Sequence, residues 1–199
     1  MKQDQVKELL LQSLEQERGG IKVYESALQC VLNDELKEEF EKYLEQTRNH
    51  ERILLNVFSK LKLDAEEASP GRTVVKLIGS ALVEAMQTAL KAGKPEAAEL
   101  VAAECVVLAE TKDHADWELI ARCHEHTSGP LKQVLQDAAD EVEDQEDEHL
   151  YHSKGWARAE QASAKGRWQP TAPCRTDAAS CFRPARAAKL FGRDVVDFY

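Results

Sequence analysis

Hydrophobic residues recur every three or four positions through most of the first 156 residues, the spacing expected of amphipathic helices. One such stretch begins near Val6, and a second runs over 36–61. Asn33 and Asp34, which lie between the two stretches, are typical of a turn followed by a helix cap. The pattern predicts a hairpin of two antiparallel helices, each about 25 to 30 residues long.

Three more helices are predicted further along the chain. A shorter one covers 73–92, where Ser69 precedes it as a cap and Gly93 stops it. A long helix follows over 95–126, and the last covers 131–156. Two long hairpins joined by a shorter crossover helix predict an all-α, four-helix bundle.

The periodic pattern stops near residue 156, so the chain is divided into a helical bundle over 1–156 and an irregular C-terminal tail over 157–199. The net charge is −10, made up of −14 in the bundle and +4 in the tail. An acidic bundle argues against a nucleic-acid partner or an anionic membrane surface. The first residues have neither the apolar stretch nor the cleavage site of a signal peptide, no apolar run matches a membrane span, and the five cysteines stand singly. A cytoplasmic protein with reduced thiols is expected.

Polar residues interrupt the apolar stripe of each long helix at a similar height. Burying one carboxylate alone costs several kcal/mol. Several carboxylates together with two histidines are explained if a cation lies among them, so these positions predict a metal site. The residues concerned are Glu17, Tyr24, Thr47, His50, Glu110, Asp113, Glu146 and His149.

The clearest local motif is Glu146-x-x-His149 in the last helix. Residues three apart project from the same side of a helix, so both side chains can reach one metal pair. This is the Glu-x-x-His unit of carboxylate-bridged di-iron bundles. Because residues 140–148 are strongly acidic, the motif has weight only together with the polar residues of the other helices.

Glu17 with Tyr24, His50, and Glu146-x-x-His149 together resemble the ligand order of the ferritin-like superfamily. The stretch over 77–93 resembles the crossover helix of the YciE/YciF-type ferritin-like proteins, a bacterial stress-associated group. The resemblance implies a ferritin-like di-iron bundle, often a homodimer. It also implies ferroxidase or peroxide-handling activity in stress response, with Tyr24 as a redox-active or neighbouring hydroxyl.

The chain departs from the family pattern at two positions. Thr47 stands where the family has a bridging Glu, three residues before His50. In the fourth predicted helix, Asp113 is preferred over Glu110 because it lies 33 residues before Glu146, a separation similar to that of the family. The expected result is a degenerate site with one bridging carboxylate, and weaker or single-metal occupancy.

Carried over by position, the resemblance implies two metal positions that share one carboxylate. Oxygen and imidazole ligands suit one or two iron ions, and manganese or zinc can occupy such a site. The ligands are assigned as Glu17 and His50 for one metal, Asp113 and His149 for the other, and Glu146 between them.

Three alternatives stay open on the sequence. A metal-free ferritin-like scaffold or interaction protein is supported mainly by Thr47. A hemerythrin-like oxygen binder is suggested by the six histidines and by the spacing of His114 and Glu118. Gly19-Gly20 indicates close helix packing beside the site, a kink in the helix, or a helix that begins at Gly20.

Overall fold

The computed structural model describes residues 3–164, and this part of the chain is all-α with no strand. The predicted all-α class is confirmed. The predicted tail residues beyond 164, including Cys174 and Cys181, lie outside the described part. The helices are α1 (Gln3–Ala27), α2 (Asp34–Leu61), α3 (Pro70–Lys91), α4 (Pro95–Glu125) and α5 (Gly129–Ala164).

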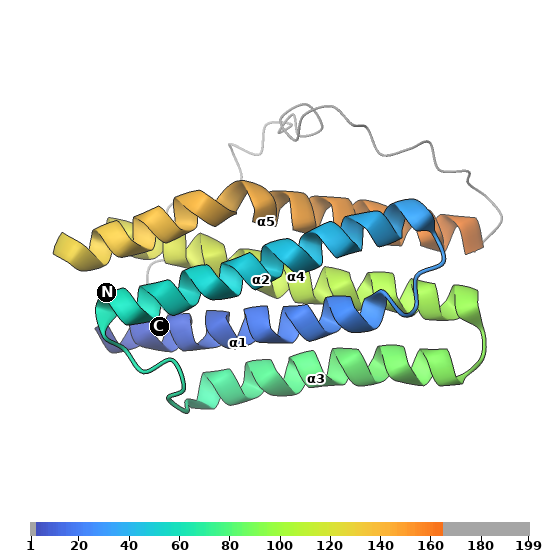
Figure 1. The fold of residues 1–199 in the computed structure, drawn as a ribbon, viewed down its shortest axis with the longest axis horizontal. Coiled ribbons are helices and arrows are strands. Elements are labelled where there is room, and N and C mark those ends of the chain that lie inside the picture. The colour runs from blue at the N-terminus through green and yellow to red at the C-terminus, as the bar shows by residue number, and fades with distance from the viewer. Residues whose placement is uncertain (1–2, 165–199) are drawn as a thin grey trace, which may run out of the picture.

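Helices α1, α2, α4 and α5 form a bundle in which each contacts two neighbours (Figure 1). The pairs α1–α2 and α4–α5 are antiparallel hairpins, as predicted. Helix α3 runs alongside α1 and packs on α1 and α4. It returns the chain along the length of the bundle, so α4 begins at the same end as α2 (Figure 1). The two hairpins are therefore joined by one crossover helix.

The hydrophobic core is divided into two clusters along the bundle axis. One contains Leu14, Phe58 and Ile120, and the other contains Tyr24 and Phe40. Along every long helix, the polar positions singled out above, other than Tyr24, lie between a segment of one cluster and a segment of the other. The bundle therefore holds a polar layer between two apolar ends.

The helix ends follow local chemistry, and two differ from the predictions. The Asn33 side chain accepts from the backbone N–H groups of Glu35 and Leu36 at 2.9 and 3.3 Å, as predicted for the cap of α2. Helix α3 begins at Pro70, earlier than predicted, because Ser69 caps it and proline suits a first helical turn.

The predicted boundary at residue 156 is too early, because α5 continues to Ala164. Ala159 is buried in the extra segment, and Gln161 donates to Glu104 of α4 at 2.7 Å. The residues of this segment are mostly small or polar, so they lack the three- and four-residue spacing of hydrophobic residues. Contacts with α4, rather than an apolar stripe, keep the segment helical.

Gly19 and Gly20 are two points of close helix packing inside α1, which continues through both. A Cβ built on Gly79 of α3 would lie 3.5 Å from the Cα of Gly19, and one on Gly20 would lie 3.3 Å from the Thr47 methyl group of α2. The interpretation that the helix begins at Gly20 is wrong, because α1 is continuous from Gln3 to Ala27. The two glycines instead let α3 and α2 approach the α1 backbone closely.

Helix α3 has an apolar face that this chain leaves exposed. Val74, Leu77 and Ile78 are exposed, while Val75 and Met86 are its buried residues. By length and composition α3 is apolar enough to cross a membrane, and 11% of its apolar window is buried. It is an exception to the expectation that no segment is apolar enough for a span.

Glu99 of α4 fixes the turn between α1 and α2. It is buried, and one of its oxygens accepts from the backbone N–H groups of Leu32 and Asn33 at 2.7 and 2.8 Å. We expect Glu99→Ala to lower the free energy of unfolding by about 2 kcal/mol, because both donors lose a charged acceptor. Urea denaturation measures this, with Glu118→Ala on the exposed side of α4 as the control. Equal stability of the two variants would contradict the assigned role of Glu99.

Candidate metal centre

Each helix of the bundle contributes to the polar layer. The six ionisable side chains are all buried, with at most 2% of each residue exposed. They project inward because each replaces an apolar residue on the core-facing stripe of its helix. They are Glu17 from α1, His50 from α2, Glu110 and Asp113 from α4, and Glu146 and His149 from α5.

The ligand atoms form two groups that share Glu146. One group contains Glu146 with His50 and His149, and the other contains Glu146 with Glu17 and Asp113. Within each group the ligand atoms lie within 4.8 Å of one another. Glu146 thus occupies the position expected of a shared carboxylate.

These two groups differ from the predicted pairs of Glu17 with His50 and Asp113 with His149, but the first predicted pair is also close, with His50 Nδ1 3.8 Å from Glu17 Oε1. Helices α2 and α5 contact each other, so their two imidazole rings stack with centroids 5.6 Å apart. Helices α1 and α4 likewise contact each other and bring their carboxylates together. Which helices are neighbours therefore decides the pairing.

Glu110 and Asp113 both reach the centre, although the spacing argument preferred one of them. Glu110 Oε2 lies 3.4 Å from His149 Nδ1. Asp113 belongs to the carboxylate group described above. The two residues are three apart on α4, so both project toward the same side of that helix.

The Nδ1 atoms of both histidines face the carboxylates. His50 Nδ1 lies 3.0 Å from Glu146 Oε1 without hydrogen-bond geometry, and His149 Nδ1 lies 3.6 Å from the same oxygen. On the far side of each ring, Nε2 meets an amide oxygen: Gln145 for His50 at 2.9 Å and Gln46 for His149 at 3.0 Å.

An amide oxygen only accepts hydrogen bonds, so each Nε2 carries a proton, and in the neutral tautomer of each ring Nδ1 then has the lone pair. Two lone pairs beside carboxylates suit a cation. Sequence reasoning missed Gln46 and Gln145. The signal that identifies them is the spacing Gln-x-x-x-His, which places each glutamine one turn before a histidine.

Two aromatic residues border the carboxylates. Trp117 Nε1 donates to Glu17 Oε1 at 2.7 Å. Tyr24 is fully buried, and burial raises its pKa well above the usual value, with the negative charge of Glu110 adding to the rise. A tyrosine that stays protonated acts here as a neutral neighbour of the centre.

The electrostatics of the layer are unbalanced. Burial raises the pKa of Glu17, Asp113 and Glu146 well above the usual values, and their mutual repulsion adds to it. Burial lowers the pKa of His50, which favours the neutral ring. No lysine or arginine is among the buried polar residues of the described chain. With no cationic side chain among them, the buried carboxyl groups of the metal-free layer tend to keep their protons.

The donor set fits a metal pair. Seven buried ligand atoms of the described chain have no hydrogen-bond partner. Buried polar atoms are nearly always paired, so these atoms call for an additional group. They are Glu17 Oε2, His50 Nδ1, Glu110 Oε2, Asp113 Oδ1, both Glu146 oxygens and His149 Nδ1.

The metal-free protein should lose stability as the pH rises above about 7. Carboxyl groups with raised pKa values bind more protons in the folded state than in the unfolded state, so raising the pH favours unfolding. His50 has the opposite effect, but only near and below its ordinary pKa of 6.5. The expected loss is up to about 1.4 kcal/mol per pH unit for each proton.

Urea denaturation of the chelator-treated protein between about pH 7 and 8.5 measures this slope. Glu146→Gln should reduce the slope, whereas Glu143→Gln, on an exposed position of α5, should leave it unchanged. A stability that rises with pH in this range would contradict the assigned burial of the carboxyl groups.

The remaining candidate residues lie outside the centre. Thr47 is buried, and its hydroxyl donates to the Tyr43 carbonyl at 2.9 Å. His114 pairs with Asp147 at 2.7 Å, while Glu118 is exposed on α4. The described chain therefore does not bring the hemerythrin-like pair into the polar layer.

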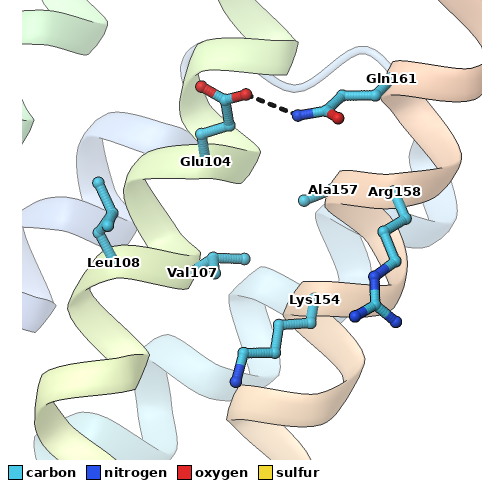
Figure 2. A pocket seen from close by; sticks show the side chains of 7 residues that line it. All are labelled: Glu104, Val107, Leu108, Lys154, Ala157, Arg158 and Gln161. Atoms are coloured by element: carbon cyan, nitrogen blue, oxygen red, sulfur yellow. Dashed lines mark hydrogen bonds between the residues drawn. The ribbon is translucent and has the colours of Figure 1, made fainter.

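Surface hollows of the molecule lie apart from the polar layer. Figure 2 shows one between α4 and α5, lined by Val107, Leu108 and Ala157 beside the cations of Lys154 and Arg158. A second lies between α1 and α4. Neither is lined by any of the six ionisable residues, so the centre is an interior site.

No family model, curated protein or solved structure matches this chain. The functional interpretation therefore depends on the geometry of the polar layer and on the topology of the bundle.

Proposed function

We propose that this chain is a ferritin-like protein that binds two divalent transition-metal ions in its polar layer. The observation that carries the proposal is the set of seven buried ligand atoms without hydrogen-bond partners, which come from all four helices of the bundle. Six residues would hold the ions: Glu17, His50, Glu110, Asp113, Glu146 and His149.

Charge and ligand chemistry support two ions. Four buried carboxyl groups, once ionised, carry four negative charges, which two divalent cations balance. Carboxylate oxygen and imidazole nitrogen suit iron(II) and manganese(II), and zinc(II) also accepts these donors. A bundle with one crossover and a Glu-x-x-His unit supports the ferritin-like assignment.

If the bound metal is iron, its Fe(II) would be oxidised by dioxygen or hydrogen peroxide. This is the ferroxidase or peroxide-handling activity expected from the resemblance. The chain's own residues provide the surroundings. Two apolar clusters exclude water from both ends of the layer. Trp117 holds one oxygen of Glu17 by its 2.7 Å hydrogen bond, which leaves the other oxygen for a metal.

Elemental analysis tests the proposal directly. We expect about two ions per chain after anaerobic loading with Fe(II), Mn(II) or Zn(II) and removal of excess metal by desalting. Absence of metal in every sample would overturn the proposal and favour the metal-free scaffold. A cytoplasmic location, a homodimer and a role in stress response stay predictions.

A further inference from the structure

The two halves of the bundle repeat the same arrangement of polar residues. The segment Gln46-Thr47-Arg48-Asn49-His50 of α2 corresponds to Gln145-Glu146-Asp147-Glu148-His149 of α5. Glu17 and Tyr24 of α1, seven apart, correspond to Glu110 and Trp117 of α4, also seven apart. Each half therefore supplies one glutamine, one histidine, one glutamate and one aromatic residue.

Contacts across the centre follow this repeat. His50 meets Gln145 while His149 meets Gln46, at 2.9 and 3.0 Å. The Trp117 indole donates to Glu17; its equivalent, Tyr24, has a buried hydroxyl without a hydrogen-bond partner, and the charge of the equivalent Glu110 adds to the burial that raises its pKa. Such reciprocal contacts relate the two halves by an approximate two-fold axis through the polar layer.

The repeat fails at one pair of equivalent positions. Thr47 is equivalent to Glu146, and Gly20 is equivalent to Asp113. Gly20 contacts Thr47 in one half, just as Asp113 approaches Glu146 in the other. The half formed by α4 and α5 therefore has two carboxylates at these positions. The half formed by α1 and α2 has only the Thr47 methyl group, which packs against the backbone of Gly20.

From this asymmetry, and resting on the proposed metal binding, we infer that Asp113 supplies the carboxylate that Thr47 lacks. Glu110, as the equivalent of Glu17, is the regular ligand of α4, and Asp113 is an additional one. The centre thus keeps four carboxylates and two histidines, with Asp113 and Glu146 both in the half formed by α4 and α5.

The geometry supports this assignment. Asp113 is 2% exposed, and its Oδ1 has no hydrogen-bond partner although it is fully enclosed. Asp116, three residues along α4 and also buried, pairs instead with Lys112. Of these two buried aspartates, only Asp113 has an unpaired oxygen available to a metal.

Metal stoichiometry of single and double variants tests the inference. The wild type should hold two Fe(II) or Mn(II) ions, and Asp113→Asn should hold one tightly, with the second dissociation constant raised about tenfold or more. Asp116→Asn, the matched control, should keep both ions.

Moving the carboxylate back provides the decisive variant. In Asp113→Asn with Thr47→Glu, we expect the second ion to return, since position 47 corresponds to Glu146 in the repeat and is buried three residues before His50 on α2. Circular dichroism confirms folding before metal is added, and Asp113→Glu, which keeps the charge in place, should also retain two ions.

The outcomes separate this inference from the proposed function. A wild type without metal overturns the proposed function, and the inference with it. A wild type with two ions and an Asp113→Asn variant with the same two affinities overturns the inference alone. Failure of a folded double variant to regain the second ion also overturns it, because position 47 would then not be equivalent.

Discussion

Glu146→Gln should abolish retention of both metal ions. Glu146 is the one residue that belongs to both ligand groups, with its Oε1 3.0 Å from His50 Nδ1 and 3.6 Å from His149 Nδ1. A carboxamide has nearly the same shape but no negative charge, so it cannot neutralise two cations. We expect affinity for both ions to fall by roughly 100-fold or more, measured by elemental analysis after anaerobic Fe(II) loading.

The matched control is Glu143→Gln on the same helix, where the side chain is exposed. It should retain both ions. The metal-free Glu146→Gln protein should also be more stable than the metal-free wild type near neutral pH, because burial raises the pKa of Glu146 and so disfavours its charge. A Glu146→Gln variant that still holds two ions would refute the shared-carboxylate assignment.

Metal loading should raise the melting temperature of the wild type by about 10 °C or more. Each ion at a concentration of about 100 times its dissociation constant stabilises the folded state by about 2.7 kcal/mol, so two ions contribute about 5 kcal/mol. The effect is large because the ions neutralise carboxylates that are buried without any cationic side chain.

Differential scanning calorimetry with and without a chelator measures the shift. The stabilisation should be nearly lost in Glu146→Gln and kept in Glu143→Gln. A wild-type melting temperature that does not respond to Fe(II), Mn(II) or Zn(II) would show that the polar layer tolerates its charges without metal, as expected for a scaffold.

Much of the fold was predictable because its signals are local. The three- and four-residue spacing over 36–61 and the cap at Asn33 define α2 almost to the residue. The end of α5 was not predictable from periodicity. Its last segment is held by Ala159 and by the contact of Gln161 with Glu104, and these depend on the presence of α4.

The candidate residues of the site could be identified from the sequence, but the distances between them could not. Charged residues on an apolar stripe are anomalous, so Glu17, His50 and Glu146 stand out from the sequence alone. Spacing along one helix favoured Asp113 over Glu110, but it does not measure distance across the bundle. The structure brings both residues to the centre.

The sequence by itself determined which face of each helix is buried, since a period of 3.6 residues assigns every position to a side of its helix. It also determined that polar residues occur at one height on four helices. Only the tertiary structure decided that α2 lies beside α5 and α1 beside α4. That arrangement places Gln46 and Gln145 on the opposite histidines and joins the two ligand groups at Glu146, because contacts between helices depend on packing and register.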